Sequence, residues 1–201
     1  MTLITRRKRP IDRMVAHLRD TRLVVIATEG KATEQQYFSL FGSSRVQVKV
    51  LPTGEDNHSS PEYVLDRLRE YREIYDLGGE DELWLMVDVD RWGTAKLAKV
   101  TKEAVDAGVK LAISNPCFEV WLLYHHVEQV DETDKCGNVV KALRAALGGS
   151  YNKANLAVEQ FRPYVETALE RARNSDVHLG RRWPHETGTH VYRVVRNIPM
   201  D

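Results

Sequence analysis

Between residues 23 and 126, short apolar runs alternate with segments of helical periodicity. The runs are rich in Val, Ile and Leu and occupy residues 23–28, 46–51, 82–87 and 109–114. Short apolar runs bounded by Gly, Pro or polar residues are typical of strands buried on both faces of a parallel sheet. Between them, apolar residues recur at helical spacing, which predicts helices over residues 31–41, 61–77 and 94–107.

This alternation predicts the fold class. Strands joined by helices of ten or more residues imply right-handed crossovers and a parallel sheet covered on both faces. We therefore expect an α/β core over residues 23–126, in which Asn115-Pro116 opens a helix containing PCFEVWLLYHH. Residues 127–201 are expected to form a helical extension packed on that core, with helices over 137–147 and 155–174.

Charge is balanced overall but unevenly distributed. The chain has 29 basic and 29 acidic residues, which argues against a protein that coats nucleic acid through bulk charge. An N-terminal arm, residues 1–22, holds seven Lys/Arg against two Asp, whereas residues 52–90 hold twelve Asp/Glu against three Arg. The basic arm could bind phosphate, and the acidic residues 52–90 could bind a metal. A solvated tail beside an acidic surface helix is the alternative, and charge alone favours it.

Two features bear on the compartment. Cys117 and Cys136 form no CxxC motif, and no His/Cys cluster at zinc spacing surrounds them, so we expect both to be reduced. The first ten residues lack the apolar centre of a signal peptide, and no run approaches about 18 apolar residues. A cytoplasmic protein without membrane contact is the simplest expectation.

Acidic residues follow two of the predicted strands. Glu29 comes directly after the first strand, and Asp88 and Asp90 come at the end of the third, in VDVDRWG. Functional groups gather at the carboxyl ends of parallel strands, and side chains two apart on a strand point the same way. If the two strands are neighbours, three carboxylates converge, and a hard cation such as Mg²⁺ would relieve their repulsion. Capping of the next helix is the structural alternative.

Two further residues are candidates for chemistry. Glu119 is the only charged residue between Phe118 and Leu123, so it either serves a second metal or a water, or binds backbone amides or an arginine. Lys153 precedes a predicted helix, where a cation does not favour the dipole, which suggests a phosphate partner; a solvated lysine is the commoner case. His125 and His126 are expected to face solvent.

Five stretches carry a resemblance to a known family. TEGKATEQQYF, VDVDRWG, SNPCFEVWLLYH, YNK and TGTHVYRVV, spread over residues 23–195, resemble the RloB-like family, which includes the abortive-infection protein AbiLii. The resemblance implies a Toprim-like, Rossmann-like parallel sheet sandwiched by helices, with Glu29, Asp88 and Asp90 as metal-binding acids. It also implies a role in bacterial anti-phage defence near restriction-modification loci, beside an ABC-type ATPase. The chain departs from the family pattern at Arg91-Trp92.

The leading hypothesis is therefore a Mg²⁺-dependent nuclease, with Mn²⁺ as the substitute ion, that cleaves DNA or RNA, including tRNA. Glu29, Asp88 and Asp90 would hold metal, Glu119 would assist and Lys153 would steady the phosphate. Contacts to nucleic acid are expected from Arg6, Arg7, Lys8, Arg9, Lys31, Arg91, Arg181 and Arg182.

Two alternatives stay open. One is a non-catalytic Toprim-like module that binds the partner ATPase. The other is a phosphatase of the haloacid-dehalogenase kind, which DVDRW resembles faintly, although Trp92 stands where that motif has Thr. The nucleic acid, the trigger and the presence of a homo-oligomer are not specified by the sequence.

Overall fold

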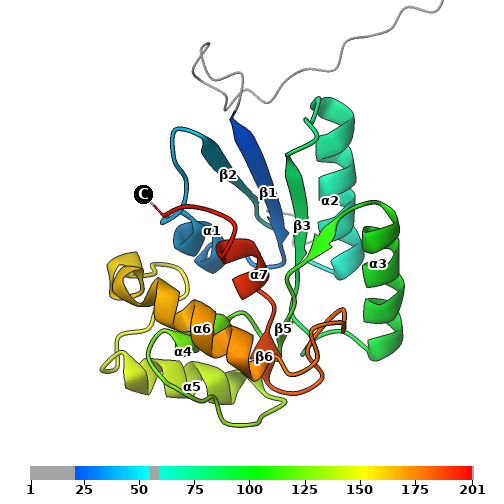
Figure 1. Cartoon of the computed structure of the whole chain (residues 1–201). Coiled ribbons are helices and arrows are strands. Elements are labelled where there is room, and N and C mark those ends of the chain that lie inside the picture. Colours follow the sequence, from blue (N-terminus) through cyan, green and yellow to red (C-terminus); the bar gives the residue numbers. More distant parts are fainter. Residues whose placement is uncertain (1–20, 55–58, 201) are drawn as a thin grey trace, which may run out of the picture.

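The computed structural model describes residues 21–54 and 59–200, and a four-stranded parallel sheet forms its centre (Figure 1). The strand order is β2-β1-β3-β4, and each neighbouring pair is parallel. The strands are β1 (Arg22–Thr28), β2 (Val46–Leu51), β3 (Glu82–Met86) and β4 (Lys110–Leu111). Because β1 and β3 are adjacent and parallel, the residues that follow them emerge at the same end of the sheet. The predicted α/β, Rossmann-like architecture is confirmed.

Helices cover both faces of the sheet. They are α1 (Thr33–Phe38), α2 (Pro61–Ile74), α3 (Thr94–Asp106), α4 (Glu119–Tyr124), α5 (Cys136–Ala146), α6 (Val165–Ser175) and α7 (Tyr192–Val195). Figure 1 shows α2 and α3 together on one side, whereas α4, α5 and α6 gather at the lower left with α1 above them. Val25 of β1 packs in the cluster formed with α2 and α3, and its neighbours Val24 and Ile26 pack in the other cluster. Burial on both faces explains why β1 is continuously apolar.

The start of α2 follows from its sequence. Ser60 is extended at the N-cap, Pro61 occupies the first turn, where its missing N–H costs nothing, and Glu62 lies near the positive end of the dipole. The buried stripe includes Val64 and Leu68, one turn apart. The helix ends at Ile74, three residues before the predicted end.

The fourth predicted strand is divided in the structure. Residues Lys110–Leu111 form β4, whereas β5 (Ser114–Asn115) leaves the main sheet to pair antiparallel with β6 (Gly188–Thr189). The Asn115–Pro116 peptide is cis, and α4 begins only at Glu119. The carbonyl oxygen of Pro116 accepts hydrogen bonds from the backbone N–H groups of Val89 (3.2 Å) and Asp90 (3.1 Å). This turn therefore positions the loop that carries the two aspartates.

The helix predicted over residues 155–174 is wrong in its first half. Residues 158–160 and 162–164 form two 3₁₀ turns, and α6 starts at Val165. The N–H of Leu156 donates to the side chain of Gln36 at 2.7 Å, and Pro163, which supplies no N–H, lies in the second 3₁₀ turn. The cluster that contains Val24 also contains Leu143 of α5 and Ala168 of α6, and both of these helices pack against α4. The domain boundaries stay a prediction, and the basic arm lies almost wholly outside the described residues.

The two cysteines are joined, which corrects the expectation that both are reduced. Cys117, two residues before α4, forms a disulfide with Cys136, the first residue of α5. The residues are 19 apart in sequence, yet their Cα atoms lie 5.6 Å apart. The loop between α4 and α5 brings the start of α5 back beside the start of α4. The spacing of the cysteines in the sequence does not reveal this tertiary contact. Across the described residues, no helix has both the length and the apolar character needed to cross a membrane.

Candidate metal centre

Glu29 and Asp88 meet at the carboxyl ends of β1 and β3. The N–H of Glu29 donates to the carbonyl of Met86 at 3.2 Å, which extends the pairing of the two strands by one residue. Oε2 of Glu29 in turn accepts a hydrogen bond from the N–H of Asp88 at 3.2 Å. The sequence analysis left open whether these two strands are neighbours; the structure places β1 beside β3, and this brings the first two acids together.

The side chains of Arg91 and Trp92 both contact the Glu29 carboxylate. The indole Nε1–H of Trp92 donates to Oε2 at 3.0 Å, and Nη1 of Arg91 lies 3.6 Å from Oε1. Burial raises the pKa of Glu29, and the hydrogen bonds from Trp92 and from the Asp88 N–H offset part of that effect. Oε1 is buried and accepts no hydrogen bond from the described part of the chain.

Asp88 is the most strongly perturbed acid of the group. Its pKa lies well above the usual range, first because burial disfavours its charge and then because four carboxylates surround it. The four belong to Glu29, Glu34, Glu119 and Asp90. Asp88 therefore lies where negative charge accumulates.

Glu34 is a member of this group that the sequence analysis missed. It lies in the first turn of α1, is 6% exposed, and burial raises its pKa to about 7, with Glu119 and Glu29 adding repulsion. A Cβ atom built on Gly30 would overlap the Glu34 carboxylate, so glycine at this position leaves the space that the side chain occupies. The signal in the sequence was the second acid of TEGKATE, which resembles an ordinary first-turn residue that favours the helix dipole.

Asp90 lies at the margin of the acidic group. It is exposed, it follows the end of β3, and it is not among the residues that line the pocket described below. Burial raises the pKa of Asp90, Arg91 lowers it, and the charges of Glu119 and Lys153 act on it as well. Its assignment as a metal ligand stays a prediction.

Glu119 and Lys153 form an ion pair. Nζ of Lys153 lies 2.5 Å from Oε1 of Glu119, and the hydroxyl of Tyr151 donates to the same oxygen at 3.0 Å. Sγ of Cys136 lies 3.5 Å from the other oxygen, Oε2. The segment that carries Lys153 is fastened to α1, because the Thr33 hydroxyl donates to the Lys153 carbonyl at 3.0 Å.

His125 was expected to face solvent, and this is wrong. It is 1% exposed, one ring nitrogen lies 3.0 Å from the Tyr37 hydroxyl, and the other lies 3.0 Å from the Trp121 carbonyl. Burial lowers its pKa to about 3, so it is neutral at physiological pH. Its ring fills the aromatic core between Tyr37 and Phe161.

A pocket of about 280 Å³ unites these groups. Its charged lining consists of the acids Glu29, Glu34, Asp88 and Glu119 and the cations Lys31, Arg91 and Lys153. Oxygen ligands in a group of mutually repelling carboxylates suit a hard divalent cation, and the cations at the same pocket suit an anionic substrate. The buried Glu29 Oε1, which accepts no hydrogen bond from residues 21–54 or 59–200, fits a ligand to such an ion.

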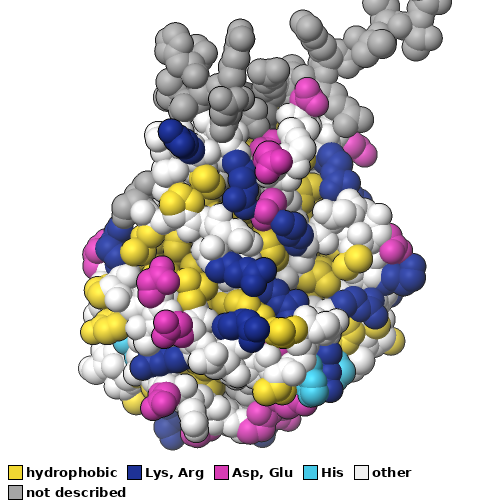
Figure 2. Space-filling model, viewed as in Figure 1, with side chains coloured by type: hydrophobic (Ala, Val, Ile, Leu, Met, Phe, Trp, Pro, Cys, Tyr) yellow, Lys and Arg dark blue, Asp and Glu magenta, His cyan; other side chains and the backbone are white. Residues whose placement is uncertain are grey.

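The residues predicted to contact nucleic acid are divided among three regions. Arg6, Arg7, Lys8 and Arg9 lie outside the described residues. Lys31 and Arg91 line the pocket. Arg181 instead pairs with Glu186 at 3.1 Å, and Arg182 donates to the Ala98 carbonyl of α3 at 3.0 Å. Figure 2 shows many Lys and Arg side chains across one face of the molecule, interspersed with acidic ones.

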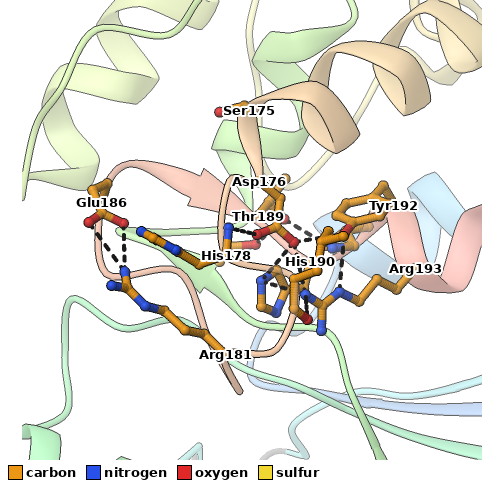
Figure 3. Close-up of polar contacts among 12 residues, drawn as sticks. Ser175, Asp176, His178, Arg181, Glu186, Thr189, His190, Tyr192 and Arg193 are labelled. Carbon is orange, nitrogen blue, oxygen red and sulfur yellow. Dashed lines mark hydrogen bonds and ion pairs between the residues drawn. The ribbon is translucent and has the colours of Figure 1, made fainter.

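A second polar network lies near the C-terminal helices (Figure 3). Oδ2 of Asp176 accepts hydrogen bonds from the Tyr192 hydroxyl (2.7 Å) and from Nη2 of Arg193 (2.8 Å), and His190 Nε2 lies 3.3 Å away. Burial lowers the pKa of His190 to about 4, so the ion pair of Asp176 is with Arg193. The network joins the end of α6 to α7 and is separate from the acidic pocket.

Comparison with protein-family models places these features in a known family. The model described as "RloB-like protein" matches residues 24–198, from β1 to beyond α7. The chain belongs to the RloB-like family. A search of curated proteins and a search of solved structures each found no match. The RloB-like match includes every acid of the pocket, the disulfide and the network of Asp176.

Proposed function

We propose that this RloB-like protein is a Mg²⁺-dependent nuclease that cleaves phosphodiester bonds in DNA or RNA, with Mn²⁺ as a substitute ion. The observation that carries the proposal is the convergence of four carboxylates in one pocket of a parallel sheet. Like charges at this spacing raise each other's pKa, and a divalent cation is the usual means of stabilising them.

Each group has a distinct part in this proposal. Glu29, Glu34 and Asp88 hold the ion, with Asp90 at the margin. When bound, Mg²⁺ would polarise a phosphoryl oxygen and lower the pKa of a bound water. Lys31 and Arg91 bind the phosphate backbone at the rim, whereas Lys153 exchanges its contact with Glu119 for the phosphate and leaves that carboxylate able to accept a proton from water.

A cleavage assay tests the proposal. Labelled tRNA, single-stranded RNA and duplex DNA are incubated with the full chain and Mg²⁺ or Mn²⁺, with and without the partner ATPase. We expect wild type to cleave at least one substrate and Asp88→Asn to lose cleavage. Asp76→Asn, at an exposed aspartate two residues beyond the end of α2, is the matched control. Equal cleavage by wild type and Asp88→Asn, or no cleavage with the ATPase present, would contradict it.

The biological setting is part of the same proposal. The family resemblance favours an effector of abortive infection that acts beside an ABC-type ATPase. Phage plating on cells that carry both genes, with wild type or Asp88→Asn, is the measurement. Protection that persists in the variant would exclude nuclease action as its cause.

One alternative has an observation in its favour. Glu119 already has Lys153 and Tyr151, and Glu29 has Trp92 and Arg91, so part of the acidic group is satisfied by the chain itself. This suits a non-catalytic module that binds the ATPase and retains at most a structural ion. Metal titration separates the two: one tightly held ion without turnover favours the module.

A further inference from the structure

Cys117, Glu119 and Cys136 form a compact group beside the acidic pocket. They come from three places in the fold: the turn after β5, the first residue of α4 and the first residue of α5. Their two sulfur atoms and one carboxylate oxygen all lie within 4.8 Å of one another. Cys117 is 1% exposed and Glu119 is 4% exposed, so water does not surround the group.

The backbone spacing suits either of two states of the sulfurs. The Cα atoms of Cys117 and Cys136 are 5.6 Å apart, inside the range of about 4.4–6.8 Å that disulfides allow. A tetrahedral site with metal–sulfur distances of about 2.3 Å separates two sulfurs by roughly 3.8 Å. Rotation of the two side chains about their Cα–Cβ bonds can provide this separation once the disulfide is broken.

The two oxygens of the Glu119 carboxylate face different groups, one the acidic pocket and the other the cysteine pair. On the pocket side, Oε1 pairs with Lys153 and accepts a hydrogen bond from Tyr151, whereas Oε2 lies 3.5 Å from Sγ of Cys136. Oε2 is therefore placed to serve as a third ligand beside the two sulfurs. Two thiolates with one carboxylate carry three negative charges, which a divalent cation and Lys153 together balance.

We propose that reduction of the Cys117–Cys136 disulfide creates a site for one thiophilic divalent cation of the Zn²⁺ class, held by Cys117, Cys136 and Glu119. A dithiol reductant supplies two electrons and two protons and becomes a disulfide itself, while the protein S–S bond breaks to give two thiols. On metal binding, both thiols release their protons to solvent. Sulfur ligands select this class of ion, whereas the all-oxygen pocket nearby selects Mg²⁺.

Cobalt titration of the full chain tests the site. Co²⁺ bound through thiolates gives intense sulfur-to-metal charge-transfer absorption in the near ultraviolet. We expect the reduced wild type to develop this band with one equivalent of Co²⁺ under anaerobic conditions, and to lose it when Zn²⁺ is added. The oxidised chain should not develop it.

Variants assign the ligands. Cys136→Ser leaves one thiolate, so it should reduce the band to about half or less and weaken Co²⁺ affinity by at least about tenfold. Glu119→Gln keeps both thiols and should weaken affinity while it retains the band. Asp88→Asn, which removes an acid of the neighbouring pocket, should leave the titration unchanged, so failure of the nuclease proposal is distinguishable from failure of this one.

Three results would overturn the site: a reduced wild type without the band, an undiminished band in Cys136→Ser, or equal binding by reduced and oxidised chains. Cys117 is buried, so Cys117→Ser is interpreted only if circular dichroism shows a folded chain. Cys136 is partly exposed at the start of α5 and provides the independent variant.

Discussion

The indole N–H of Trp92 donates a hydrogen bond to Oε2 of Glu29 at 3.0 Å, the same oxygen that accepts the Asp88 N–H. The residue that distinguishes this chain from the expected motif is thus part of the site. Trp92 binds one oxygen of the Glu29 carboxylate, whereas the exposed side chain of Arg91 lies 3.6 Å from the other oxygen, Oε1.

Trp92→Phe should keep the aromatic ring and remove the donor. We expect affinity for Mg²⁺ to fall by about tenfold. Removing a hydrogen bond that orients a metal ligand, made by a residue that does not itself bind the metal, typically has an effect of this size. Calorimetric titration with Mg²⁺ measures it. Trp183→Phe, in the loop beside α3, is the matched control and should bind as wild type does; equal affinity in both variants would exclude an orienting role for Trp92.

Glu34 should make stability depend on pH. Its pKa is raised from 4.5 in the unfolded chain to about 7 in the folded one, so the folded state retains a proton that the unfolded state has lost. Stability should therefore decrease as pH rises from about 4.5 through about 7, with a total cost of about 3 kcal/mol above that. Urea unfolding of wild type and Glu34→Gln at pH 5 and pH 8, with chelator present, measures the difference.

Glu34→Gln should remove the contribution of Glu34 to this pH dependence, which reduces the slope, and should make the variant more stable than wild type at pH 8. Glu159→Gln, at an exposed position, is the control and should keep the wild-type profile. An unchanged slope between pH 5 and pH 8 in Glu34→Gln would show that Glu34 titrates normally.

Gly30→Ala should disturb the site through contact and not through backbone strain. The added methyl group meets the Glu34 carboxylate, and we expect a loss of about 1–3 kcal/mol in the free energy of unfolding. Glu34→Ala in the same chain should remove most of that loss, so the double variant reveals the coupling. Gly79→Ala meets no atom within 4 Å and is the control. An additive double variant would contradict the assigned contact.

Asp88→Asn should stabilise the metal-free protein while it removes metal binding. The neutral amide no longer repels the surrounding carboxylates, so the melting temperature in chelator should rise. In excess Mg²⁺ the order should reverse, because wild type gains stability from the bound ion. Differential scanning calorimetry in both conditions tests this, with Asp76→Asn as the unaffected control; a lower melting temperature in chelator would show that Asp88 is stabilising.

The sheet could be predicted because its signals are local. An apolar strand such as β1 and the acid that follows it are adjacent in the sequence, and the rule on carboxyl ends of parallel strands brings Glu29 to Asp88. Other features depend on contacts between distant segments. The side chain of Gln36 accepts a hydrogen bond from the Leu156 N–H, the α4–α5 loop brings Cys117 to Cys136, and packing against Tyr37 buries His125.

Glu34 was missed for a different reason. An acid in the first turn of a helix is common on exposed surfaces, so its presence in α1 carried little information. Only the burial of that turn against the sheet, together with the space left by Gly30, distinguishes it from an ordinary helix start.

The segment that carries Lys153 is fastened to α1 along its length. Beyond the Thr33 bond to the Lys153 carbonyl, the side chain of Gln36 donates to Ala154 and accepts from Leu156. Glu34 is on the same helix, so an acid and a cation that both line the pocket share one support. A displacement of α1 would carry both charges together, and the width of the pocket between them would be preserved while its distance from Glu29 and Asp88 changed.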